Sequence, residues 1–334
     1  MFCPVRYHEH TSRKVWKQLW IAAFCAVLLC RPAAAQSGLD EVHVLPPSSQ
    51  SSHERNRAFL KANVDLVLVN VTVNDSKDQA ITHLRASDFS VLDDKHRQQI
   101  RYFSSDDVPI SIVIVLDSSG SMRNRFEPAR NAAIEFFQAC NPQDEFAVVT
   151  FADQPRLLVE SNGSISEIEA ALNRVQPGGE TALWDAVYLG LQRLRHASYT
   201  RKALLLISDG EDNHSRYLQK EIKSVLQEAD VQLYAISVIQ SFPTKQEEKS
   251  GLLALDEVAS TTGGQLLLTH DASELHRAVR QISDDLRSQY VLGYLPGPSA
   301  RDGKWHHLKV ELNVPKSRKF RAYAKNGYYG SVEP

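Results

Sequence analysis

The stretch Ser111–Phe126 reads SIVIVLDSSGSMRNRF. Its first half is a run of apolar, mostly β-branched residues, which is typical of a strand that is buried on both faces of a sheet. The run ends abruptly in Asp117, Ser119 and Ser121, whose spacing allows one loop to point all three side chains toward the same spot. Because open α/β sheets hold their ligands at the carboxyl ends of the strands, this stretch predicts a ligand site at such an edge.

Two later segments of the sequence complete the predicted site. PGGETALWDA places two glycines and a threonine directly before a predicted helix, and LLLISDGEDN ends a second buried strand in an aspartate. Carboxylate and hydroxyl oxygens are hard ligands that suit Mg²⁺, Mn²⁺ or Ca²⁺ and are poor for zinc. We expect Mg²⁺, or Mn²⁺ or Ca²⁺ in its place, to be bound by Asp117, Ser119, Ser121, Thr181 and Asp209. The alternative is a cluster of turn and cap residues that binds no metal.

The order of the predicted elements indicates the fold. Between Ser111 and Ser288 strand-like and amphipathic helix-like segments alternate, which favours an α/β domain with a mostly parallel, doubly wound sheet and helices on both faces. Residues 61–107 and 287–334 alternate apolar and polar side chains as strands do. Neither segment can bury a face alone, so we expect both to form one β-sandwich, with the α/β domain of residues 108–286 inserted between them. Two independent small β-units are the alternative.

The N-terminal region predicts export. Residues 1–35 combine a basic start, the apolar run LWIAAFCAVLLC and three consecutive alanines, which together are typical of a secretory signal peptide. The apolar run is short for a membrane span, which needs roughly 20 residues; an uncleaved signal anchor is the alternative. Residues 36–60 are polar, contain several serines and prolines, and are predicted to be a flexible linker. We therefore expect an exported protein, periplasmic or extracellular, with no membrane span after signal cleavage.

The motifs D-x-S-x-S, Gly-Gly-x-Thr and Ser-Asp-Gly follow one another in this order along the chain. In this the chain resembles the von Willebrand factor A-domain family with its metal-ion-dependent adhesion site, over Ser111–Ser288. The resemblance implies that the three hydroxyl residues named above ligate the ion directly and that the two aspartates act partly through water. Ser208 stands where many members have threonine. The flanking segments extend the similarity, over Val64–Gly330, to exported bacterial proteins described as VWFA-related.

These features favour a binding module over an enzyme. Several expected ligands are neutral hydroxyls, so the charge of the ion stays partly uncompensated and attracts an Asp or Glu carboxylate of a protein partner. The residues expected to line the rim and select that partner are Glu180, Glu211, Asp212 and Asn213. One alternative is a structural or scaffolding envelope protein whose metal only stabilises the fold. The other is a divalent-metal hydrolase, against which the sequence shows neither a phosphate-binding loop nor a serine with an evident histidine base.

The net charge and the positions of the histidines and of Cys140 argue against three further kinds of function. The formal net charge of −2 gives no electrostatic reason to expect nucleic acid as a partner. His306 and His307 are adjacent on a predicted strand and therefore point to opposite faces, which makes them a poor pair of metal ligands. Cys140 is the only cysteine after residue 35 and lies at the end of an apolar helical pattern, so we expect an inert thiol.

Overall fold

A computed structural model describes residues 66–160, 164–239, 246–315 and 318–331. The chain divides into two units, 1–56 and 57–334, and all described residues belong to the second. The predicted signal peptide and linker, residues 1–35 and 36–60, lie outside the described residues. Among the helices within the described ranges, none is both long and apolar enough to cross a membrane.

The centre of the molecule is a six-stranded sheet in the order β10-β9-β8-β5-β6-β7. Its strands are β5 (Ser111–Asp117), β6 (Glu145–Phe151), β7 (Pro155–Val159), β8 (Lys202–Ser208), β9 (Gln232–Val238) and β10 (Leu266–Thr269). All neighbouring strands pair in parallel except β6 with β7. Every residue of β5 is buried, because β5 lies inside the sheet and both of its faces are covered by helices. The apolar run that opens the sequence analysis is therefore this inner strand.

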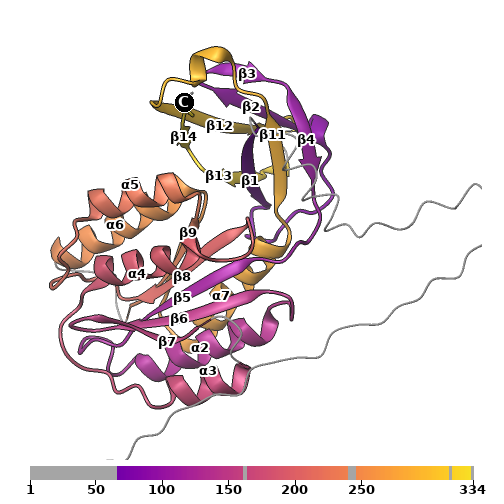
Figure 1. The fold of residues 1–334 in the computed structure, drawn as a ribbon. Helices are drawn as coiled ribbons and strands as arrows, with labels where there is room; N and C mark the ends of the chain where they lie inside the picture. The colour runs from indigo at the N-terminus through magenta and orange to yellow at the C-terminus, as the bar shows by residue number, and fades with distance from the viewer. Residues whose placement is uncertain (1–65, 161–163, 240–245, 316–317, 332–334) are drawn as a thin grey trace, which may run out of the picture. The chain divides into compact units, whose positions relative to one another are not determined.

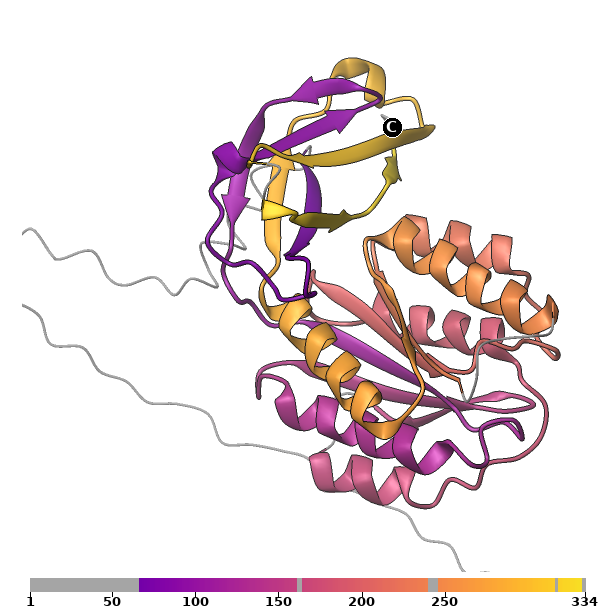
Figure 2. The same cartoon turned by 180° about the vertical axis from the view of Figure 1, so that it is seen from behind.

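Helices cover both faces of this sheet. They are α2 (Phe126–Ala139), α3 (Ile165–Leu172), α4 (Leu183–Arg195), α5 (Gln219–Ala229), α6 (Gln246–Thr262) and α7 (Ala272–Arg287). Figures 1 and 2 show α4, α5 and α6 on one face and α2, α3 and α7 on the other. Each set closes its own apolar core against the sheet, and the expected doubly wound α/β architecture is confirmed. Cys140, just after α2, is half-buried, and burial raises the pKa of its thiol to about 12.

The flanking segments form two four-stranded antiparallel sheets, β13-β1-β11-β4 and β14-β12-β2-β3. Their strands are β1 (Val67–Asn74), β2 (Phe89–Asp93), β3 (His96–Gln98), β4 (Ile100–Ser104), β11 (Tyr290–Tyr294), β12 (Trp305–Leu312), β13 (Arg321–Ala324) and β14 (Gly327–Tyr329); single 3₁₀ turns are η1 (Ala86–Asp88) and η2 (Pro298–Ala300). Each sheet takes strands from before and after the α/β domain. One apolar core joins them: the rings of Phe89 and Tyr290, from different sheets, lie 5.0 Å apart. The β-sandwich built from both flanking segments is thus confirmed.

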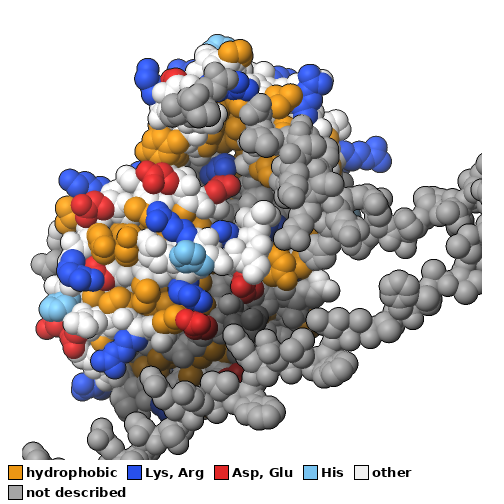
Figure 3. All heavy atoms as spheres, in the orientation of Figure 1, with side chains coloured by type: hydrophobic (Ala, Val, Ile, Leu, Met, Phe, Trp, Pro, Cys, Tyr) orange, Lys and Arg blue, Asp and Glu red, His pale blue; other side chains and the backbone are white. Residues whose placement is uncertain are grey.

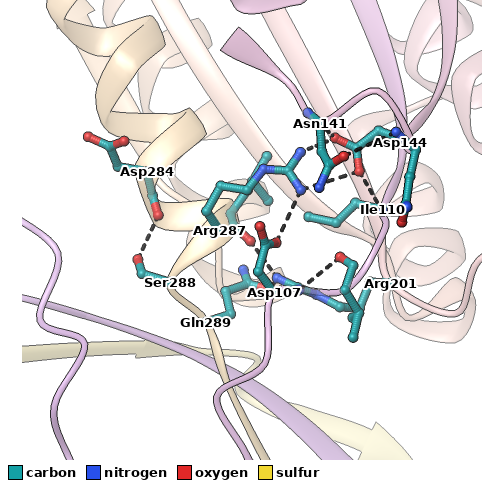
Figure 4. Close-up of polar contacts among 12 residues, drawn as sticks. Asp107, Ile110, Asn141, Asp144, Arg201, Asp284, Arg287, Ser288 and Gln289 are labelled. Atoms are coloured by element: carbon teal, nitrogen blue, oxygen red, sulfur yellow. Dashed lines mark hydrogen bonds and ion pairs between the residues drawn. The ribbon is translucent and has the colours of Figure 1, made fainter. Parts of the chain in front are cut away.

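Two arginines, buried Arg201 and half-buried Arg287, hold together the places where the chain enters and leaves the α/β domain (Figure 4). Arg287, at the end of α7, pairs with Asp107 at 3.2 Å and with Asp144. Arg201, before β8, donates to the carbonyl of Val108 at 3.3 Å and to the Gln289 side chain at 2.9 Å. Because the segments that enter and leave the α/β domain are fixed to each other here, residues far apart in the sequence meet in one sandwich.

Candidate metal centre

The loop after β5 folds around the carboxylate of Asp117. One oxygen, Oδ1, accepts the backbone N–H of Ser119 at 2.9 Å, and the other, Oδ2, accepts the hydroxyl of Ser208 at 2.6 Å. The Oγ atoms of Ser119 and Ser121 lie 3.0 Å apart. Asp117 and Ser119 have no exposed surface. The first motif therefore gathers a carboxylate and two hydroxyls at the carboxyl end of the inner strand, as its spacing predicts.

The two-glycine segment is tied to this loop through its backbone. The N–H of Gly178 donates to the carbonyl of Ser118 at 2.8 Å, and the N–H of Gly120 donates to the carbonyl of Gly179 at 2.9 Å. Gly179 has a φ of +87°, and a Cβ on it would lie 2.7 Å from a carboxylate oxygen of Asp153. Only glycine fits this conformation and this space. The close approach places Thr181, which is 3% exposed, just before the first turn of α4.

Asp209 follows β8, the strand that pairs with β5, and is 8% exposed. Burial, and then the negative charge of Asp209, raise the pKa of Asp117 to about 6. The two carboxylates are therefore close enough to repel each other across a site from which water is largely excluded. Two carboxylates surrounded by neutral hydroxyls are a donor set that fits a hard divalent cation.

Arg125, just before α2, is a site residue that the sequence analysis missed. Its Nη2 lies 3.1 Å from Oδ2 of Asp209 and also donates to the carbonyl of Ser121 at 2.8 Å, while Nη1 donates to the carbonyl of Val238. A guanidinium thus binds one of the two carboxylates and fixes the position of the Ser121 loop. No sequence signal pointed to it, because its ion-pair partner lies 84 positions further along the chain.

Two of the four expected rim residues accept hydrogen bonds from the backbone at the start of α4. Oδ1 of Asp212 accepts the backbone N–H of Leu183 at 2.9 Å, and Oδ1 of Asn213 accepts that of Thr181 at 2.8 Å. Both side chains therefore satisfy backbone donors at the start of α4. Through these bonds, the loop after Asp209 holds the second motif in place.

The other two rim residues have different surroundings. Glu180 is exposed, and its backbone N–H donates to Oδ1 of Asp153 at 2.7 Å. Glu211 is half-buried, and its N–H donates to Asp209 at 3.3 Å. Beside them Asp153 borders a hollow of about 390 Å³ whose wall includes the packed rings of Tyr188 and Tyr217. On the face seen in Figure 1, acidic, basic and apolar side chains are interspersed over the α/β domain (Figure 3).

Comparison with known proteins agrees with this geometry. The family model of the von Willebrand factor type A domain matches residues 112–211, which include both aspartates and all three hydroxyl residues. The chain carries a von Willebrand factor type A domain. This match confirms the predicted resemblance to the von Willebrand factor type A domain family.

The relatives that match this chain are distant. Inter-alpha-trypsin inhibitor heavy chain H4 of Bos taurus is 24% identical over 38% of this chain and 16% of its own length. An uncharacterized protein of Borreliella burgdorferi is 23% identical over 52% of this chain and 57% of its own length. The chain thus spans less than a fifth of the bovine protein. A solved structure, von Willebrand factor type A from Catenulispora acidiphila, matches with a TM-score of 0.49 and 15% identity over 81% of this chain and 66% of its own.

Proposed function

We propose that this protein is a non-enzymatic module that binds a protein partner through a divalent cation. Mg²⁺, or Mn²⁺ or Ca²⁺ in its place, would be held by Asp117, Ser119, Ser121, Thr181 and Asp209. A position left open by these residues would take an Asp or Glu carboxylate of the partner. The observation that carries the proposal is the meeting of two buried carboxylates and two hydroxyls at the carboxyl ends of β5 and β8.

Charge accounting supports an external carboxylate as the final ligand. The carboxylates of Asp117 and Asp209 carry two negative charges, and the guanidinium of Arg125 already offsets part of the second. The hydroxyl ligands are neutral. A divalent cation in this setting keeps a net positive charge, and attraction between charges is stronger in a buried site than in bulk water. An acidic side chain of a partner supplies the missing negative charge.

The surroundings of the site suggest where the partner would rest. Exposed Glu180 and half-buried Glu211 stand beside the motifs and would select partners by repelling some acidic surfaces and pairing with basic ones. Asp212 and Asn213 would act mainly by holding the start of α4. The predicted signal peptide supports export to the periplasm or the extracellular space as the place of action, and the mixed charge supports a protein rather than nucleic acid as the partner.

The hydrolase alternative finds less support in the hydrogen bonds of the serines. The hydroxyl of Ser118 donates to the carbonyl of Phe151 at 2.8 Å, and that of Ser119 lies 3.0 Å from Ser121. Neither contact supplies an imidazole that could act as a general base. The scaffolding alternative differs from our proposal in one measurable respect, since a metal that only stabilises the fold would have no coordination position open to an added carboxylate.

Calorimetry with Mg²⁺ and water proton relaxation with Mn²⁺ test the proposal. We expect the wild-type chain to bind one ion. The matched control Asn124→Ala, which changes an exposed residue of the same loop, should bind it equally well. Asp117→Ala and Thr181→Ala should lose this binding and keep the circular dichroism spectrum of the wild type. Bound Mn²⁺ should enhance water relaxation through an exchangeable water, and an acidic peptide should reduce the enhancement. Metal binding without this response would favour the scaffolding alternative. Equal metal binding by all four chains would refute the assigned ligands.

A further inference from the structure

A second cluster of polar side chains lies in the β-sandwich, at the end of β2. Asp93 is 6% exposed, and its Oδ2 accepts hydrogen bonds from the hydroxyls of Tyr294 at 2.8 Å and Tyr328 at 2.9 Å. Its other oxygen, Oδ1, is buried and accepts no hydrogen bond. A buried carboxylate oxygen without a donor is costly, so the fold must gain something by keeping it there. This oxygen faces the imidazole of His306, with 3.6 Å between Oδ1 and Nδ1.

The imidazole of His306 is surrounded by carboxylates. Its Nδ1 lies 2.9 Å from Oδ2 of Asp94, and its Nε2 lies 3.1 Å from Oδ1 of Asp302. One atom each of Asp93, Asp94 and His306 lie within 4.8 Å of one another. His306 is 8% exposed, whereas His307 points to solvent, as the alternation along the strand predicts. Two partners of His306, Asp93 and Asp94, come from a distant segment, and the third, Asp302, lies four residues before it.

A protonated imidazole alone does not account for this arrangement. An imidazolium would donate to Asp94 and Asp302 and would still leave Oδ1 of Asp93 without a hydrogen bond at 3.6 Å. Three carboxylates and one imidazolium would also leave two negative charges uncompensated.

We propose that Asp93, Asp94 and His306 bind a divalent metal ion, and that Zn²⁺ is the ion this ligand set prefers. Ligands about 2.0–2.2 Å from a tetrahedral zinc lie roughly 3.4 Å from one another. The distances from Nδ1 to the two carboxylate oxygens, 2.9 and 3.6 Å, lie on either side of that value. An imidazole nitrogen with two carboxylates suits zinc better than magnesium. Asp302 completes the pattern, since a metal-binding histidine usually donates its other N–H to a carboxylate.

The site joins the two sequence segments that build the sandwich, on neighbouring strands of one sheet. Asp93 and Asp94 lie in the segment before the α/β domain, and His306 lies in the segment after it. The ring of His306 stacks on Tyr328, with 5.4 Å between centroids, which fixes the plane of the imidazole. A bound ion therefore links segments that are distant in the sequence and stabilises the folded sandwich. With three protein ligands, a fourth position is left for water or an added ligand.

Zinc binding by the full chain in the Asp117→Ala background tests this site, because the substitution disables the other proposed centre. With excess Mg²⁺ present, we expect one equivalent of Zn²⁺, a higher melting temperature with zinc, and an X-ray absorption spectrum with one nitrogen ligand and oxygen ligands. Adding His306→Gln or Asp94→Asn should abolish all three effects, and adding the control His307→Gln should leave them intact.

Asp94→Asn keeps the test decisive if His306→Gln fails to fold. Asp94 has a φ of +45°, which asparagine tolerates, and its Oδ1 accepts the backbone N–H of His307 at 3.0 Å, a bond that an amide oxygen can also make. The turn should therefore survive this substitution. Absence of zinc binding in the Asp117→Ala chain, or unchanged binding after Asp94→Asn, would overturn the proposal. Neither result would bear on the first metal centre.

Discussion

A buried carboxylate between α7 and β1 should make the stability of this protein depend on pH. Asp285 is 1% exposed. Its oxygens accept hydrogen bonds from the side-chain amides of Asn74 and Gln265, both at 3.1 Å, and no ion pair neutralises it among the described residues. Burial raises the pKa of Asp285 from 3.8 to about 7, against the opposing effect of the hydrogen bond from Asn74.

The sign of the pH dependence follows from the higher pKa of Asp285 in the folded chain than in the unfolded chain. Between about pH 4 and pH 7 the folded chain keeps a proton on Asp285 that the unfolded chain has released. The contribution of this bound proton to the free energy of unfolding is therefore fully present below about pH 4 and is lost as the pH rises through 7. A pKa shift of about three units corresponds to about 4 kcal/mol, at 1.36 kcal/mol per unit. Asp285→Asn carries no charge and removes this contribution.

Urea unfolding of the wild-type chain and of Asp285→Asn, from pH 4 to pH 8 with EDTA, measures the difference. We expect the two free energies of unfolding to be similar near pH 4 and to diverge as the pH rises, until the variant is more stable at pH 8 by up to about 4 kcal/mol. Comparing the chains cancels the contribution of Asp117, whose pKa is raised to about 6 in both. Parallel curves for the two chains would refute the assignment of the pH dependence to Asp285.

Three further predictions concern the first metal centre. Gly179→Ala should destabilise the fold and weaken Mg²⁺ binding, measured by thermal unfolding and calorimetry, because its Cβ would lie 2.7 Å from the Asp153 carboxylate; unchanged binding would contradict the tight-loop argument. Asp212→Ala should cost about 1 kcal/mol of stability by removing the acceptor for the N–H of Leu183, and Asp212→Asn should restore it unless the charge itself is needed. Arg125→Gln should tighten Mg²⁺ binding about five-fold, because removing a nearby cation relieves roughly 1 kcal/mol of repulsion; weaker binding would show that its bonds to the loop matter more.

Much of the fold and of the first site could be predicted from local patterns. The apolar run ending in Asp117 placed the inner strand, because a strand buried on both faces needs no polar alternation. The glycine pair before Thr181 indicated a close backbone approach, which the φ of Gly179 confirms. The strand-like segments at both ends pointed to a shared sandwich, since neither could bury its apolar face alone. The first two predictions each needed one short stretch of sequence, and the third needed the strand patterns of both flanking segments.

What the sequence by itself determined is therefore the order of strands and helices and the motifs at the strand ends. Only the tertiary structure decided which distant side chains meet: Arg125 with Asp209, and His306 with Asp93 and Asp94. The physical reason is that periodicity depends on neighbours along the chain, whereas an ion pair or ligand set depends on strand register and helix packing. Two residues that are close in sequence can face opposite ways, as His306 and His307 do, while residues from opposite ends of the chain converge on one site.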